Sequence, residues 1–270
     1  MGRQLSTMSI QDTHHLSERA KHLFAPVNSF SWNLVSTRHT QFPYFDELLG
    51  RPVWRGRKIL DFGGNIGTFL ESAGDNVDHA DYWCIDLNPA VIAQGRELYP
   101  RAHFVHFNRY SPQYNPHGMR HHPIPDCGVK FDFILAFSVF THVDQTEMLE
   151  LVESLRRMLS DDGVLAFTFF DPQYDRSLSC PDMPPGATVI WNLGPRQDEA
   201  VLRSAGWFVL IDDQLYLEPA DAVCHQTRNG KPLESFCSFF TARYMQSLFP
   251  GAEIHAPVQR EWQHCCVLRK

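Results

Sequence analysis

Two aspartates and a run of glycines are the residues of this chain that point most directly to chemistry. An apolar stretch that contains Asp61 leads into Gly63, Asn65 and Gly67, and the next apolar stretch ends at Asp86, nineteen residues further on. Glycine lets the backbone turn tightly and approach a ligand without a Cβ in the way. An acid after the next strand can accept hydrogen bonds from both ribose hydroxyls of an adenosine. The spacing therefore predicts a nucleoside-cofactor site; the alternative is a structural turn with a helix-capping aspartate.

The same turn argues against a dinucleotide. Seating a pyrophosphate at a helix N-terminus takes the pattern Gly-x-Gly-x-x-Gly, and the best alignment puts Phe62 where the first glycine belongs. Asn65 interrupts the glycines, but Asn is the non-glycine residue that best tolerates left-handed backbone, so the turn can keep its shape.

These residues resemble the first motif of class I S-adenosylmethionine (SAM)-dependent methyltransferases, acid-x-Gly-x-Gly-x-Gly, with Asn65 in place of the middle glycine. Segments 84–89, 131–143 and 159–167 resemble the family's second-, fourth- and fifth-strand motifs in the same order. The third-strand motif is weaker, because Asn108 stands where the family often has an acid. The resemblance covers about residues 58–170 and resumes at 238–270. It implies a Rossmann-like α/β fold and SAM as the cofactor.

The resemblance also assigns residues to parts of SAM. It implies that Asp61, Gly63 and Gly67 lie near the methionine part and that Asp86 holds the ribose. Asn108 and Arg109 are expected near the adenine, with Phe137 and Ser138 on its other side. The complete expected cofactor set is Asp61, Gly63, Gly64, Asn65, Gly67, Asp86, Leu87, Asn108, Arg109, Phe137 and Ser138.

Two residues are candidates for catalysis. His142 follows the fourth apolar run, and as a base it could take a proton from a hydroxyl or amine; the alternative is a structural role. Asp171, just beyond the fifth run, either contacts the acceptor or caps a turn. Methyl transfer depends mainly on alignment and exclusion of water, so a non-catalytic SAM-binding partner subunit stays an alternative. An aminopropyltransferase is disfavoured because segment 137–139 lacks the acid those enzymes carry there.

Composition favours a small organic acceptor, methylated on O or N. The formal charge is −7, and an acidic surface repels phosphate backbones; a protein or tRNA acceptor stays the alternative. We expect specificity to lie in segments 20–55, 108–130 and 171–237, outside the core motifs. Aromatic residues there that are candidates to contact the acceptor, as opposed to packing in the core, are Trp32, Tyr44, Tyr110 and Trp191.

Neither histidines nor cysteines predict a metal site. His106 and the loop histidines His117, His121 and His122 fit no standard ligand spacing. The seven cysteines are odd in number and include no C-x-x-C pair, which is typical of reduced thiols in a cytosolic protein. The longest apolar runs are too short to span a bilayer. We therefore expect a cytoplasmic monomer or homodimer with no metal, membrane or nucleic-acid partner.

The elements that must position these residues follow from short apolar runs that alternate with helical stretches. Helices are predicted after Asn88 and after Asp144, the second with Glu147 in the reciprocal capping position and a stop at 161–163. A further helix is predicted over 241–249. The predicted strands are 58–62, 82–86, 103–106, 131–136 and 164–169, followed by a terminal hairpin over 252–258 and 263–268.

The fold class that results is α/β: a Rossmann-like, doubly wound, seven-stranded sheet that is mostly parallel, with an antiparallel last strand. Residues 1–55 are predicted to be an N-terminal helical cap segment. Residues 56–270 are predicted to form the SAM-binding core, with an irregular insertion at about 171–237.

Overall fold

The computed structural model describes residues 40–111, 113–171, 174, 207–211, 214–217 and 236–270. The chain divides into two compact units, residues 1–36 and 37–270, and every described residue belongs to the second. Within the described residues, no helix is both long and apolar enough to cross a membrane.

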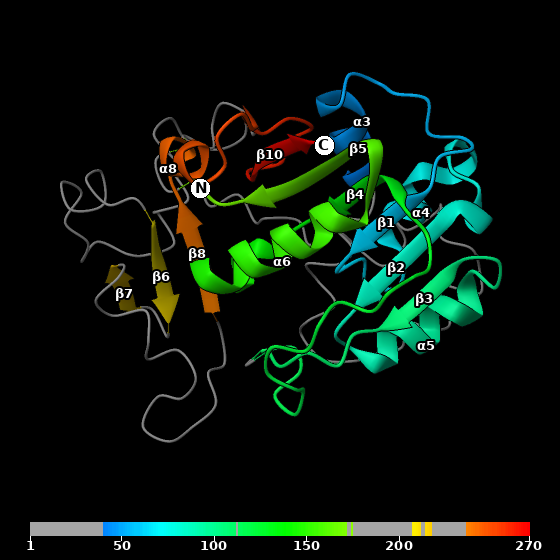
Figure 1. Cartoon of the computed structure of the whole chain (residues 1–270), viewed down its shortest axis with the longest axis horizontal. Helices are drawn as coiled ribbons and strands as arrows, with labels where there is room; N and C mark the ends of the chain where they lie inside the picture. The colour runs from blue at the N-terminus through cyan, green and yellow to red at the C-terminus, as the bar shows by residue number, and fades with distance from the viewer. Residues whose placement is uncertain (1–39, 112, 172–173, 175–206, 212–213, 218–235) are drawn as a thin grey trace, which may run out of the picture. The chain divides into compact units, whose positions relative to one another are not determined.

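One sheet organises this unit (Figure 1). Its order is β3-β2-β1-β4-β5-β10-β9, with β1 to β5 parallel to one another and β10 antiparallel to β5. This confirms the predicted seven-stranded, mostly parallel sheet and its antiparallel last strand. The strands are β1 (Ile59–Phe62), β2 (Tyr82–Asp86), β3 (His103–His106), β4 (Phe131–Ala136), β5 (Leu159–Phe169), β9 (Glu253–His255) and β10 (His264–Arg269).

Helices cover both faces of the sheet, and this is why the strands are apolar on both sides. The helices are α3 (Gln41–Leu48), α4 (Thr68–Ala73), α5 (Pro89–Leu98), α6 (Gln145–Met158) and α8 (Ala242–Leu248), with 3₁₀ turns η2 (Gly74–Asn76), η3 (His79–Asp81) and η4 (Phe140–His142). One core cluster joins the sheet to α6 and α8 through Leu151 and Met245. The other joins it to α3, α4 and α5 through Tyr44, Phe69 and Ile92. The part of segment 1–55 that carries α3 therefore packs into the core.

Local capping determines where the helices begin. The side chain of Asn88 accepts a hydrogen bond from Ala90 N at the start of α5, and Asp144 accepts one from Glu147 N at the start of α6, as predicted. The predicted stop at 161–163 is wrong. Helix α6 ends at Met158 and the chain continues directly into β5. Leu159 of β5 pairs with Phe131, and the register between β4 and β5 shifts between Phe131 and Phe133.

The segment after β5 also differs from its prediction as an irregular insertion. Three strands there, β6 (Trp207–Ile211), β7 (Gln214–Leu217) and β8 (Phe236–Phe240), form a separate antiparallel sheet in the order β7-β6-β8. Strand β8 is tied to the end of β5, because Phe240 N donates to Phe170 O at 2.8 Å and Phe239 stacks on Phe170. The sequence between β5 and β8 is rich in proline and glycine, so its pattern did not reveal that β6 and β8, which are distant in sequence, pair.

Candidate functional site

The glycine turn after β1 has the backbone that its sequence predicts. Gly63, Asn65 and Gly67 all have positive φ, at 77°, 55° and 93°, so Asn65 does take the left-handed conformation. A Cβ at Gly63 would lie 2.3 Å from Cγ2 of Val139, in the segment after β4. Glycine is therefore required here both for the turn and for the close approach of the two strand ends.

Asp86, at the end of β2, is bound to the turn. Its Oδ2 accepts from Asn65 N at 3.0 Å and its Oδ1 accepts from Asn88 N at 2.9 Å. Burial raises the pKa of Asp86, and these backbone N–H groups oppose that shift. Each carboxylate oxygen has a second lone pair, so both can also accept from a vicinal diol. The two acceptor oxygens of Asp86 therefore fit the ribose hydroxyls of an adenosine cofactor.

Asp61 lies beneath the turn and is 2% exposed. Its Oδ2 accepts from the Tyr82 hydroxyl at 2.6 Å, and a Cβ at Gly64 would come within 2.4 Å of the same oxygen. Burial raises the pKa of Asp61 to about 7, although the Tyr82 hydrogen bond acts in the opposite direction. Asp61 thus supports the turn from below, and its expected place beside the methionine part of SAM stays a prediction.

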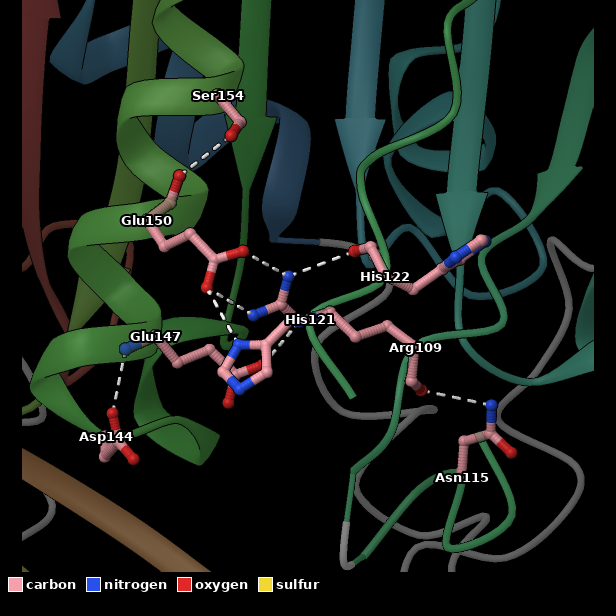
Figure 2. A network of polar contacts seen from close by, with 8 residues as sticks. All are labelled: Arg109, Asn115, His121, His122, Asp144, Glu147, Glu150 and Ser154. Carbon is pink, nitrogen blue, oxygen red and sulfur yellow. Dashed lines mark hydrogen bonds and ion pairs between the residues drawn. The ribbon is translucent and has the colours of Figure 1, made fainter. Parts of the chain in front are cut away.

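The loop after β3 uses its polar side chains differently from the expectation. Arg109 is 4% exposed, and its guanidinium binds Glu147 and Glu150 of α6 at 2.8 to 2.9 Å and His122 O at 3.1 Å (Figure 2). This guanidinium is thus engaged by α6 and by the returning side of the loop, and the expected place of Arg109 near the adenine stays a prediction. The Glu147 side chain accepts from Arg109 through Oε1, and its reciprocal capping role stays a prediction.

Two other expected cofactor residues come from the loops after β2 and β3. The Asn108 side-chain oxygen accepts from Asn115 Nδ2 at 3.1 Å. Leu87 is partly buried and packs against the first core cluster. Their predicted contacts with SAM stay predictions.

The segment after β4 carries Phe137 and Ser138. Ser138 has a φ of 59°, and its N–H donates to Thr168 Oγ1 at 2.7 Å, which ties the end of β4 to β5. Phe137 packs edge-on against Tyr44. Tyr44 is completely buried, with its hydroxyl donating to Gln263 O at 2.7 Å. Tyr44 is therefore a core residue, which corrects its candidacy as a substrate contact.

Of the other proposed acceptor contacts, only Tyr110 lies within the described residues. The Arg120 guanidinium stands over its ring, 4.4 Å from the centroid, so this ring takes part in a cation–π contact. Trp32 and Trp191 lie outside the described residues, and their roles stay predictions.

The two catalytic candidates have distinct surroundings. His142 ends η4, and its Nε2 lies 3.1 Å from the hydroxyl of Tyr114. Asp171 is buried, and its Oδ2 accepts from Ala242 N at 2.9 Å, in the first turn of α8. This hydrogen bond is the turn-capping role that was the alternative to acceptor contact for Asp171.

Sequence reasoning missed His264, at the start of β10. It is 7% exposed, and its Nδ1 has no hydrogen-bond partner among the described residues. Burial lowers the pKa of His264, while the nearby Asp171 raises it. The sequence signal that could have singled out His264 is a histidine at the start of an apolar run. In the structure, His264 pairs with Phe169 at the end of β5. Among the described residues, no group of three or more His, Cys, Asp or Glu side chains is arranged to hold a metal ion.

Comparisons with known proteins agree with this geometry. A family profile described as "Methyltransferase domain" matches residues 60–165, from β1 into β5. The sequence has no significant match among curated proteins. The fold resembles that of the pyocyanin biosynthetic protein PhzM, with a TM-score of 0.52 at 13% identity over 94% of this chain and 62% of PhzM.

Two further solved structures resemble the chain less closely. A proposed O-methyltransferase from Nostoc punctiforme has a TM-score of 0.48 at 16% identity, over 88% of this chain and 60% of that one. SAM-bound CalS10, an amino pentose methyltransferase from Micromonospora echinaspora, has a TM-score of 0.48 at 14% identity, over 90% of this chain and 98% of CalS10. The chain thus spans only about six tenths of the length of the Nostoc protein and of PhzM.

The profile match covers the glycine turn, the ribose acid and the segment after β4, and the strand order is that of the expected fold. Residues 60–165 therefore match a methyltransferase domain, and the chain has the fold of PhzM.

Proposed function

We propose that this protein is an enzyme that transfers a methyl group from SAM to an oxygen or nitrogen of a small-molecule acceptor. The observation that carries the proposal is the glycine turn with Asp86 bound to it, at the same sheet edge as His142. In open parallel sheets, ligands bind at this edge, outside the carboxyl ends of the strands. The acidic net charge of −7 and the likeness to PhzM, a pyocyanin biosynthetic protein, favour a small acceptor over a nucleic acid.

In this proposal, SAM supplies a methyl group already activated by its sulfonium. Asp86 accepts hydrogen bonds from the ribose hydroxyls, and Gly63 and Gly67 let the backbone approach the cofactor. His142 would take the proton that an acceptor hydroxyl or amine loses as it becomes the nucleophile. The remaining task of the chain is to align acceptor and cofactor and to exclude water.

Cofactor binding is tested by calorimetry with S-adenosylhomocysteine and with NAD. The wild-type protein should bind the first and not the second. Asp86→Ala removes charge-assisted hydrogen bonds worth about 2–4 kcal/mol, so affinity should fall by about 30-fold to 1000-fold. Asp75→Ala is the control, because Asp75 is exposed in η2, and it should leave affinity unchanged. Binding of NAD alone would contradict the proposal.

The acceptor class is tested by incubating the protein with methyl-labelled SAM and fractionated extracts, followed by mass spectrometry of the product. Label should enter the small-metabolite fraction. Label only in protein or tRNA would assign a macromolecular acceptor instead. Cofactor binding with no transfer to any fraction would assign a non-catalytic SAM-binding subunit.

A further inference from the structure

The loop between β3 and β4 has a compact hydrogen-bonded form over residues 107–111 and 113–122. Its two sides pair through Met119 N to Asn108 O at 2.8 Å and Tyr110 N to Met119 O at 3.0 Å. Its tip closes through two bonds between Ser111 and Asn115, at 3.0 and 3.1 Å. Tyr114, which directly precedes Asn115, is therefore held on a closed turn.

Arg109 fixes this loop to the helix that follows His142. Figure 2 shows the Arg109 guanidinium held from two sides. On one side are Glu147 and Glu150, in the first two turns of α6. On the other is the carbonyl of His122, on the returning side of the loop. Bidentate pairing of a guanidinium with a carboxylate fixes orientation as well as distance. The loop and the start of α6 are thus held in one relative position.

Tyr114 spans the space between this loop and η4. Its hydroxyl lies 3.1 Å from His142 Nε2, and the two rings meet edge to face, with centroids 5.1 Å apart at an interplanar angle of 84°. Burial raises the pKa of Tyr114, with Cys237 and Asp86 adding to the shift. The hydroxyl therefore stays protonated at neutral pH, and its oxygen can accept a hydrogen bond from Nε2–H, which leaves Nδ1 as the nitrogen able to take a proton.

We propose that Tyr114 is a positioning residue for His142: through Nε2 it holds the imidazole in one orientation and one neutral tautomer at the edge of the sheet where the acceptor binds. The tautomer of a histidine is set by the hydrogen bond that one of its nitrogens makes. The hydrogen bond exists independently of the proposed methyl transfer. Only its catalytic consequence rests on the proposed function.

The tautomer is read by NMR with ¹⁵N-labelled histidine, above the titration range of His142, with the signal assigned through His142→Gln. The wild-type ring should show the ¹⁵N shifts of one neutral tautomer. Tyr114→Phe keeps the aromatic ring but removes the hydroxyl, and should move both shifts toward an average of the two tautomers. Tyr110→Phe is the matched control from the same loop, because Tyr110 contacts Arg120, and it should leave the spectrum unchanged.

A purely structural tyrosine would leave the His142 shifts alone, so identical ¹⁵N shifts in wild type and Tyr114→Phe would overturn the proposal. The wild-type spectrum is a test in itself, because an exchanging mixture of tautomers there would overturn it whether or not the variant folds. Calorimetry with S-adenosylhomocysteine on the same samples is expected to give affinities within about twofold of one another. Loss of binding in wild type would defeat the methyltransferase proposal, and the spectra would still decide the role of Tyr114.

With an acceptor in hand, turnover supplies the catalytic test. Tyr114→Phe should lower kcat about tenfold, a modest part of a general-base contribution, and leave the KM for SAM unchanged. An unchanged kcat together with changed ¹⁵N shifts would overturn the catalytic consequence of the hydrogen bond.

Discussion

A buried carboxylate beneath the glycine turn has an energetic cost that only its environment reveals. Asp61 lies near the end of an apolar strand and accepts a hydrogen bond from the Tyr82 hydroxyl, and burial raises its pKa to about 7 from the usual 3.8. Between those pH values the folded protein holds a proton that the unfolded chain has released. Stability therefore falls as pH rises through this window, and the full cost is present above it.

Asp61→Asn should remove this cost. A pKa difference of this size corresponds to about 4 kcal/mol, so the variant should be more stable than wild type by about 2–4 kcal/mol at pH 8, with the gap closing toward pH 4. Urea unfolding at several pH values measures it. A gap of constant size across the whole pH range would show that the carboxylate titrates normally.

Residues whose role depends on local backbone were predictable from the sequence, and residues whose role depends on distant partners were not. Asn65 takes the left-handed conformation that a glycine-rich turn demands. Arg109 and Tyr44 were assigned to a ligand, but they contact Glu150 and Gln263, which are remote in sequence. Pattern and propensity carry no information about such pairs. His142 could be proposed from the sequence, but its partner Tyr114 could not, for the same reason.

At the scale of elements, the Arg109 contacts should stabilise the loop and α6 together. Arg109→Met removes a buried cation from two carboxylates that are themselves partly exposed, at 28% and 41%, and should cost about 2–4 kcal/mol. Arg157→Met, at an exposed pair with Glu153 later on the same helix, should cost less than about 0.5 kcal/mol. Denaturant midpoints compare the two. Equal costs would mean that burial adds nothing to the Arg109 pairs.

Strands β1 to β4 and helices α5, α6 and α8 were predictable because their apolar periodicity and caps are local signals. The same signals failed where a tertiary contact decided the outcome. Asp161, Asp162 and Gly163 have the composition of a turn, yet they lie within β5, where the register with β4 shifts between Leu159 and Val164. Strands β6 to β8 pair across a long segment that is rich in breakers, so their sheet left no periodic trace.

For the whole molecule, the packing joins the last strand of the insertion to the main core. Phe240 of β8 is completely buried, in the cluster that contains α6 and β10. Phe240→Ala should therefore lower the free energy of unfolding of the entire described unit by about 3–5 kcal/mol, seen as one calorimetric transition at a lower temperature. Val53→Ala, at an exposed site, should stay within about 0.5 kcal/mol. A separate low-temperature transition would mean that β8 unfolds independently of the sheet.

The place of β10 between β5 and β9 has a consequence for synthesis on the ribosome. Thr168 of β5 and Gln263, which immediately precedes β10, are 95 residues apart, and at ordinary rates of elongation that distance takes about 5–20 s to translate. During this interval the edge of β5 that later pairs with β10 has no partner strand. The side chains of β5 are largely apolar on both faces of the sheet. Unpaired apolar edges template association with other chains. The nascent protein should therefore need a chaperone most while the segment between β5 and β10 is being made.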